Sequence, residues 1–404
     1  MLTMFRLPRL IRPPHQQRAG CTDALPSSGV ENSSQDLLCD QAGRPAHLGH
    51  GFVPQSLWGP AWSLAQRRIE PAWGGVSRVW GEGCSVSGVV AARAVSGLQI
   101  VNLCTVKPAE LDGLWQREER WWREQLFWDI SGTIAMLKPV IERGGLPGKA
   151  VRVGARTVAC AYYMIAERLG VICGLVVSPE WSSAGVGGML LNETVADIRR
   201  QGVPRIESQV VAIDCPWLTP VFEREGFRTY WREFLRLDLG RSRGPVSPLA
   251  MVHLEPWQGT HLREAAPIMQ MAYGGGVDAE INELYRTSDG CGAVLNDILT
   301  QGGCGVLVAQ ASALARHRGR GIGFAVVTEI APRQAHLAQV VVLPEYQRRG
   351  VGRWLLGYSL SRLAELHFDT LSLIVSRSNH RALRMYRAME FQSVLSFPVF
   401  VWER

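Results

Sequence analysis

The chain has 404 residues, of which 47% are hydrophobic, and its formal net charge is +7. This length allows two or three domains with real cores. The basic residues are scattered among acidic ones without a Lys/Arg block, which argues against a nucleic-acid-binding protein. No apolar run approaches the roughly 20 residues of a membrane helix, so we expect no membrane association.

Residues 1–95 show no sustained periodicity and are rich in Gly, Ser, Pro and Gln, so we predict a low-complexity, poorly ordered leader. The first 18 residues carry four arginines and no acid, which leaves a transit peptide as an alternative to a cytoplasmic location. Against it, prolines at positions 8, 13 and 14 break any amphipathic helix. The nine cysteines are dispersed without CxxC or zinc spacing, so we expect reduced thiols, a cytoplasmic protein and no metal.

Regular patterns begin at Leu98. We predict strands at 98–106, 206–213 and 230–239, a three-stranded antiparallel meander over 149–179, and helices at 111–128, 187–201 and 218–225. The first helix is aromatic on one side, with Trp115, Trp122 and Phe127. We interpret these aromatic residues as a core stripe, the alternative being an aromatic wall for an acceptor or partner.

A second set of elements follows a Gly/Ser/Pro-containing linker at 241–249. It consists of predicted strands at 251–257 and 305–314, helices within 259–300, a hairpin of strands 323–330 and 336–343, a helix at 353–366, a strand at 371–376, a helix at 379–389 and a last strand at 393–403. The pattern therefore predicts an N-terminal domain at 96–240 and a C-terminal domain at 250–404.

The stretch from Val340 to Gly352 is the most informative part of the chain. Four branched or leucyl residues, Val340–Leu343, predict a buried strand, and Pro344 closes it. A basic, glycine-containing turn follows directly before a helix. Such a turn points backbone N–H groups and a helix dipole at one spot, which suits a phosphate or pyrophosphate.

The two domains look like copies of one another. Pro344-Glu345, Gly350-Val351-Gly352 and Leu355-Leu356 match residues 165 positions earlier, and Tyr386 and Phe391 match Phe222 and Phe227 at an offset of 164. These matches occur in order at nearly one offset, which indicates an internal repeat.

The C-terminal copy resembles the GNAT superfamily of acyl-CoA-dependent N-acetyltransferases. Its turn Gln347-Arg348-Arg349-Gly350-Val351-Gly352 fits the Gln/Arg-x-x-Gly-x-Gly/Ala signature of that family, and Asn379, Ala382, Tyr386 and Phe391 fit its second signature. The family usually has Gly before this Phe, whereas this chain has Glu390. The resemblance covers 250–404 well and 98–240 as a degenerate copy.

The resemblance implies an α/β fold with a mixed sheet, splayed beside the strand that precedes the turn, in two tandem domains. It also implies acetyl-CoA as co-substrate, an amine acceptor (a small molecule or a peptide), and Tyr386 as the general acid that protonates the leaving thiolate. Residues implied to bind the cofactor are Val340, Val341, Val342, Leu343, Gln347, Arg348, Arg349, Gly350, Val351, Gly352, Arg353 and Asn379.

The general base is left open between three candidates. Some family members carry a Glu eleven residues before the signature Gln, and that position holds His336 here. Glu329, across the predicted hairpin, is the second candidate for the base, and a water-mediated relay is the third.

The N-terminal copy has lost the chemistry-bearing side chains. Ser182, Phe222 and Cys215 stand where the C-terminal copy has Gln347, Tyr386 and Asn379. We expect a structural partner that shapes the acceptor site, with residual cofactor binding as an alternative. For the whole chain, the alternatives to an N-acetyltransferase are a non-catalytic acyl-CoA-binding or regulatory protein and a relative that transfers aminoacyl or peptidyl groups. A thiol-cofactor synthase of the tandem type would be one kind of N-acetyltransferase. The acceptor and the oligomeric state stay open.

Overall fold

The computed structural model describes residues 97–404 except 167, 183–184, 211–214, 241–247 and 301–303. The chain divides into two compact units, Met1–Gly49 and His50–Arg404, and all described residues lie in the second unit. The predicted leader at 1–95 lies outside the described residues. Residues 97–240 are named the N-terminal half and residues 248–404 the C-terminal half.

The N-terminal half follows the predicted order of elements with two additional helices. Its strands are β1 (Leu98–Asn102), β2 (Gly148–Val153), β3 (Arg156–Ala166), β4 (Leu169–Val177), β5 (Arg205–Ser208) and β6 (Arg228–Asp238). Its helices are α2 (Asp112–Trp121), α3 (Ser131–Glu142), α4 (Pro179–Ser182), α5 (Val186–Arg200) and α6 (Leu218–Arg224). The sequence pattern does not predict α3 or the short α4. The predicted helix at 111–128 ends in a π-helical turn, Trp122–Leu126, followed by Phe127 in the left-handed region with φ 56°.

The C-terminal half repeats this layout. Its strands are β7 (Val252–Pro256), β8 (Val306–Leu307), β9 (Ala313–His317), β10 (Arg320–Ala331), β11 (Gln334–Val342), β12 (Thr370–Ser376) and β13 (Gln392–Glu403). Its helices are α7 (Leu262–Tyr273), α8 (Val277–Ile281), α9 (Ser288–Thr300), α10 (Val351–Glu365) and α11 (His380–Ala388). The structure reproduces the repeat: β4 and α5 correspond to β11 and α10 at the offset of 165.

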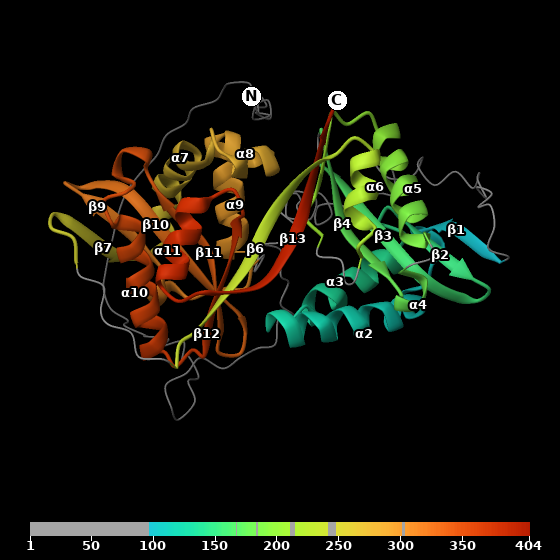
Figure 1. Ribbon diagram of the computed structural model, residues 1–404, viewed down its shortest axis with the longest axis horizontal. Helices are drawn as coiled ribbons and strands as arrows, with labels where there is room; N and C mark the ends of the chain where they lie inside the picture. Colours follow the sequence, from blue (N-terminus) through green and yellow to red (C-terminus); the bar gives the residue numbers. More distant parts are fainter. Residues whose placement is uncertain (1–96, 167, 183–184, 211–214, 241–247, 301–303) are drawn as a thin grey trace, which may run out of the picture. The chain divides into compact units, whose positions relative to one another are not determined.

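The two halves share one sheet because they exchange their last strands. The described strands form the order β1-β2-β3-β4-β5-β13-β6-β12-β11-β10-β9-β7, with β8 beside β10. Strand β6 pairs with β12 of the C-terminal half, and β13 pairs with β5 of the N-terminal half. Figure 1 shows β6 and β13 side by side between the two halves, where they also pair antiparallel with each other. Nothing in the sequence pattern predicts this exchange.

The alternation of side chains along β3 shows why helices cover both faces of the sheet. Cys160, Tyr162 and Met164 face a core that α2 and α3 complete, whereas Ala159, Ala161 and Tyr163 face a core built with α5 and α6. Successive strand residues point to opposite faces, so a strand apolar on both needs a helical layer on each side. Of the aromatic residues in the predicted helix at 111–128, Trp115 and Trp122 are buried in the first core, and Phe127 is 37% exposed.

The exchanged strands also exchange core residues. Leu235 and Leu237 of β6 are buried in the core of the C-terminal half, and Phe400 of β13 is buried in the core of the N-terminal half. Phe400 stacks on Phe222 of α6 with ring centroids 3.8 Å apart. None of the helices within the described ranges has the length and apolar character required to cross a bilayer.

Candidate active site

The glycine turn of the C-terminal half lies between β11 and α10, as its sequence predicts. Gly350 has φ 86° and precedes the first residue of α10, and Arg348 has φ 64°. A Cβ at Gly352 would lie 3.7 Å from its nearest neighbour, on Val342, so the start of the helix is open. The turn therefore leaves room for a ligand group against the N-terminus of α10.

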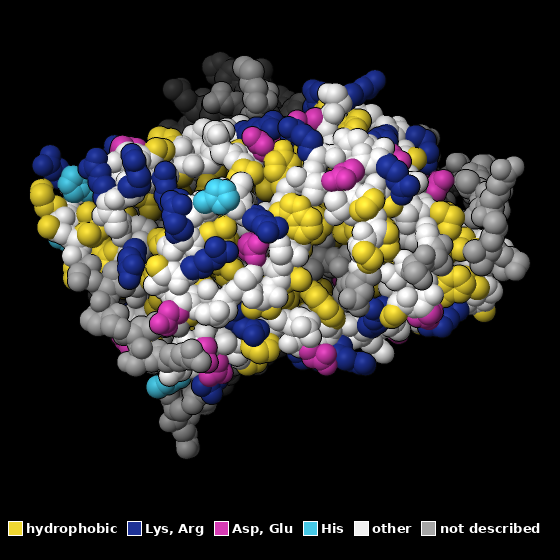
Figure 2. Space-filling model, viewed as in Figure 1, with side chains coloured by type: hydrophobic (Ala, Val, Ile, Leu, Met, Phe, Trp, Pro, Cys, Tyr) yellow, Lys and Arg dark blue, Asp and Glu magenta, His cyan; other side chains and the backbone are white. Residues whose placement is uncertain are grey.

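The side chain of Gln347 holds this turn in place. Its Nε2 donates to the carbonyl of Val342 at 3.1 Å, and its Oε1 accepts a hydrogen bond from Arg381 Nη1 at 2.8 Å. One amide thus ties the end of β11 to the turn and to α11. Figure 2 shows basic side chains gathered over the part of this face where α10 and α11 lie.

A large cavity opens where the sheet splays. Strands β11 and β12 pair in parallel only from Gln334↔Thr370 to His336↔Ser372, and a bulge interrupts the β10–β11 pairing between Val326 and Val327. Beyond this point the strands separate around a cavity of about 910 Å³. Predicted site residues among those lining it are His336, Val340, Val341, Val342, Gln347, Arg348, Gly350, Gly352, Arg353, Asn379 and Tyr386.

Tyr386 lies on α11 and faces the cavity. It is 5% exposed, and its hydroxyl has no hydrogen-bond partner among the described residues. Burial raises the pKa of Tyr386, and the negative charge of Asp278 raises it further. The phenol therefore stays protonated at neutral pH and can donate its proton into the cavity.

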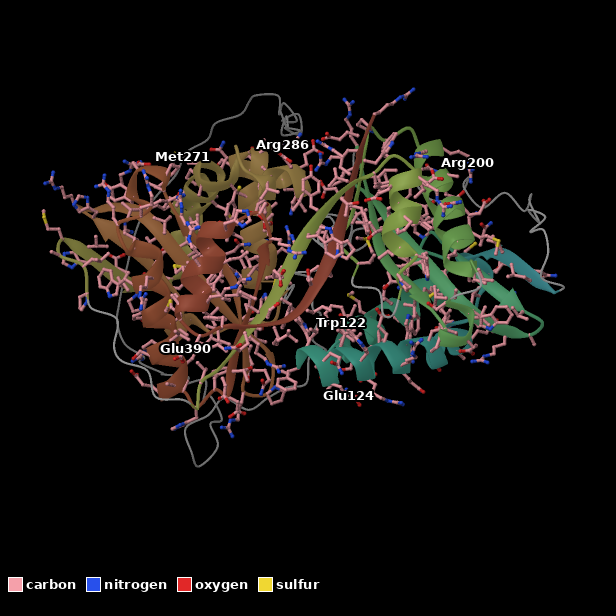
Figure 3. All side chains as sticks on the ribbon, viewed as in Figure 1. Trp122, Glu124, Arg200, Met271, Arg286 and Glu390 are labelled. Carbon is pink, nitrogen blue, oxygen red and sulfur yellow. The ribbon has the colours of Figure 1, made fainter. Side chains whose placement is uncertain are left out.

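Asn379 caps the helix that carries Tyr386. Its side-chain oxygen accepts from the N–H of Ala382 at 3.2 Å, which satisfies one unpaired donor of the first turn. At the other end of α11, Glu390 adopts φ 66°, the left-handed conformation in which the family usually has Gly (Figure 3). The substitution therefore keeps the backbone of the turn.

His336 lines the cavity but lies in an apolar environment. Its ring is 2% exposed, lies 4.9 Å from the ring of Trp128, and is 2.9 Å from Ser372 Oγ through Nδ1. Burial lowers the pKa of His336 to about 3. The imidazole is therefore neutral at pH 7 and a weak proton acceptor.

Glu329 does not line the cavity. Its Oε1 accepts a hydrogen bond from the backbone N–H of Arg333 at 2.9 Å, at the turn between β10 and β11. Three of the predicted cofactor residues also lie outside the lining. Leu343 and Val351 are buried in the core, and Arg349 lies over the ring of Tyr346.

Several residues lining the cavity were not singled out by sequence reasoning. Asp278 of α8 accepts a hydrogen bond from Ser376 Oγ at 2.7 Å, and Arg232 of β6 lies 3.9 Å from its carboxylate. Gln209, just after β5, reaches the same cavity. Arg232 and Gln209 belong to the N-terminal half, so no local signal in the C-terminal copy could reveal them.

The corresponding turn of the N-terminal half is filled by an indole. A Cβ at Gly187 would lie 2.0 Å from the ring of Trp217, so this ring lies directly on the glycine. Trp217 Nε1 donates to Ser182 Oγ at 3.4 Å. Trp217 and Ser182 stand at the positions of Arg381 and Gln347, so an aromatic ring replaces the cation and covers the glycine at the start of α5.

The splay next to this turn is filled as well. The cavity there measures about 20 Å³, and its lining includes Trp115, Trp122, Tyr162 and Gly174. The ring of Tyr162 lies over Gly174, because a Cβ at that glycine would be 2.2 Å from it. The N-terminal half thus has the same arrangement of strands and helix, but side chains fill the space that forms the cavity in the C-terminal half.

Family models match both halves of the chain. The model described as "Acetyltransferase (GNAT) family" matches residues 286–391, and the model described as "Acetyltransferase (GNAT) domain" matches residues 91–210. Together these matches take in more than half of the chain.

Solved structures share the arrangement of both halves. A GCN5-related N-acetyltransferase from Sphaerobacter thermophilus superposes with a TM-score of 0.58 at 14% identity, over 76% of this chain and 96% of that one. A tandem GNAT protein from the clavulanic acid biosynthesis pathway gives 0.52 at 16% identity, over 76% and 98%. At these identities the likeness concerns the fold.

Curated relatives match a shorter stretch. The [ribosomal protein bS18]-alanine N-acetyltransferase of Escherichia coli K12 is 36% identical over 65 residues, which is 16% of this chain and 44% of that protein. The chain therefore spans less than half the length of the curated relatives it matches.

Proposed function

Because the chain belongs to the GNAT family and carries two copies of its domain, we propose that it is an acetyl-CoA-dependent N-acetyltransferase whose C-terminal copy does the chemistry. The observation that carries the proposal is the cavity that brings the open glycine turn and Tyr386 together. The proposed location is the cytoplasm, on the ground of the dispersed cysteines.

Acetyl-CoA fits the cavity in one direction. The backbone N–H groups of the turn at Gly350 and the N-terminus of α10 suit its pyrophosphate, with Arg348, Arg353 and Arg384 beside them. The pantetheine arm would follow β11 along Val340–Val342 into the splay. In this orientation the thioester would lie toward Tyr386, which lines the same cavity.

The proposed reaction is direct transfer. The neutral amine attacks the thioester carbonyl, the new C–N bond forms, the C–S bond breaks, and the leaving thiolate takes the proton of Tyr386. The proton that the nitrogen loses as the amide forms restores Tyr386, and an amine that arrives as an ammonium ion loses one further proton before it attacks. The low basicity of His336 and the position of Glu329 favour another acceptor for that proton, either water or a carboxylate that faces the cavity.

We assign the N-terminal half a supporting role. Trp217 occupies the phosphate position and Phe222 has no proton to donate, which speaks against both cofactor binding and catalysis there. Its contribution is to supply β6 and Gln209 to the working cavity.

The second candidate is a non-catalytic acyl-CoA-binding protein. The buried, unpaired hydroxyl of Tyr386 favours the enzyme, because a binding protein has no need of a proton donor at the thioester. For the acceptor we propose a primary amine. The E. coli relative is named for acetylating an alanine of a ribosomal protein, so protein N-termini form one class to test.

Calorimetric titration with acetyl-CoA, followed by thiol-release assays over a panel of amines, tests the proposal. We expect acetyl-CoA to bind and at least one amine class to release CoA. If acetyl-CoA does not bind, the proposal is wrong. Binding without turnover of any amine would support the non-catalytic alternative.

A further inference from the structure

Arg232 is a mostly covered cation whose one carboxylate partner among the described residues is distant. Its side chain is 12% exposed and lines the cavity, and its Nε makes no hydrogen bond to any described residue. The nearest carboxylate, on Asp278, is 3.9 Å from Nη2. A buried guanidinium with unused donors costs free energy unless an anion pairs with it.

Arg205, a buried arginine of β5, makes a full set of ion pairs and hydrogen bonds for comparison. Its side chain is 4% exposed and donates to Glu207 Oε1 at 2.6 Å, to Glu403 and to the carbonyl of Glu280. All these contacts of Arg205 are with other residues of the chain, which is what a purely structural arginine requires. Arg232 differs: its Nε has no partner among the described residues, and its side chain lines the cavity.

Asp278 gives this end of the cavity a negative charge next to the positive one. Its carboxylate is fixed by Ser376 Oγ at 2.7 Å and is close enough to Tyr386 for its charge to act on the phenol. Asp278 and Tyr386 line the same cavity, so an amine held on Asp278 would share that cavity with the thioester proposed to lie toward Tyr386. A carboxylate on the same molecule would reach Arg232, because the two protein charges are 3.9 Å apart.

We propose that the acceptor is a small amine with a carboxylate close to its amino group, as in an amino acid. Arg232 binds the carboxylate as a charge-assisted pair, and Asp278 binds the ammonium and takes its proton before the attack. The leaving thiolate takes the proton of Tyr386, and the second proton that the nitrogen loses as the amide forms returns to Tyr386, so only the proton taken by Asp278 is released overall. This inference rests on the proposed function and adds a substrate-binding role for the exchanged strand β6.

The test compares acceptors with and without the carboxylate, using the full chain and saturating acetyl-CoA. The panel contains the standard protein amino acids and β-alanine, each beside its carboxamide, together with spermidine and a peptide amide that begins with alanine. We expect at least one free amino acid to exceed its carboxamide in kcat/KM by about tenfold or more.

Substitutions at Arg232 then test whether this residue causes the preference for the free amino acid over its carboxamide. Arg232→Gln is expected to lower kcat/KM for the free amino acid by about 100-fold, mainly through KM, and to abolish the preference over the carboxamide. Arg232→Lys should recover part of it. Arg228→Gln is the matched control, since Arg228 lies on the same strand with a side chain 54% exposed and pairs with Glu403.

Three results would overturn the proposal: no acetylation of any free amino acid, equal rates for acids and carboxamides, or a preference that survives Arg232→Gln. Calorimetry with acetyl-CoA separates these from a failure of the proposed function. Binding of acetyl-CoA in the same preparation would leave the N-acetyltransferase assignment standing while the acceptor class is rejected.

Discussion

The indole of Trp217 lies directly on Gly187, at the position that Gly352 holds in the C-terminal half. In the C-terminal half the equivalent of Trp217 is Arg381, which hydrogen-bonds Gln347 at the edge of the cavity. The same backbone turn is therefore closed in one copy and open in the other. At the glycine itself, the difference is that Trp217, just before α6, covers Gly187, whereas nothing lies within 3.7 Å of a Cβ at Gly352.

This difference predicts one acetyl-CoA per chain. Gly350→Asp should abolish binding, because it places a side chain and a negative charge in the phosphate position. Gly185→Asp is the matched control: both glycines have positive φ, 86° and 72°, so the backbone cost is similar. Calorimetry should show that Gly185→Asp binds one acetyl-CoA with the affinity of the wild type. Two binding sites, or a loss of affinity in Gly185→Asp, would contradict a closed turn in the N-terminal half.

Tyr386→Phe should lower turnover by about 100-fold while acetyl-CoA affinity stays nearly unchanged, since only the proton donor is removed. Because the pKa of Tyr386 is raised, wild-type kcat should show no loss from deprotonation of this phenol between neutral pH and pH 10. Tyr358→Phe serves as control, because that hydroxyl donates to the Gln310 carbonyl outside the cavity. Unchanged turnover in Tyr386→Phe would show that Tyr386 is not the general acid.

His336 should make the fold sensitive to acid. Its pKa is about 3 in the folded protein, below the ordinary value of 6.5, so the unfolded chain binds one more proton between these values. Stability is therefore expected to fall as the pH drops from 6.5, with a slope of up to about 1.4 kcal/mol per pH unit from this group. The free energy of unfolding, determined in urea at pH 7 and at pH 5, measures this loss of stability.

His336→Gln should reduce that loss of stability, because the amide does not titrate and can still bond Ser372. His253→Gln, at an exposed position on β7, should leave the pH dependence as in the wild type. If the free energy of unfolding of His336→Gln depends on pH as steeply as that of the wild type, another group causes the acid sensitivity.

Phe400→Ala should destabilise the N-terminal half although the residue is near the C-terminus of the chain. We expect a loss of about 3–5 kcal/mol, the usual range for a buried Phe cut to Ala. The double variant with Phe222→Ala should be less destabilised than the sum of the single ones, by about 0.5–1.5 kcal/mol, because the two rings stack. Additive losses in urea unfolding would argue against the strand exchange.

The repeat, the order of most elements and the glycine turn could be predicted from local pattern alone. Gly350 and Gly352 before an apolar helix, and Asn379 three residues before Ala382, are short-range signals, because turn and cap geometry depend on neighbours in the chain. The same holds for Tyr386, which the motif places on the cavity side of α11.

The end of the cavity proposed to bind the acceptor, and the choice of the C-terminal copy as the proposed active one, depend on contacts between distant residues. Arg232 reaches the cavity because β6 pairs with β12, and local pattern cannot say which sheet a strand joins. Likewise, His336 has a catalytic spacing in sequence but is buried against Trp128, more than two hundred residues away, and loses its basicity through desolvation. Periodicity and turn chemistry are local properties that the chain carries in order. Strand partners, burial and the charges that meet across a cavity arise only when the two halves pack together.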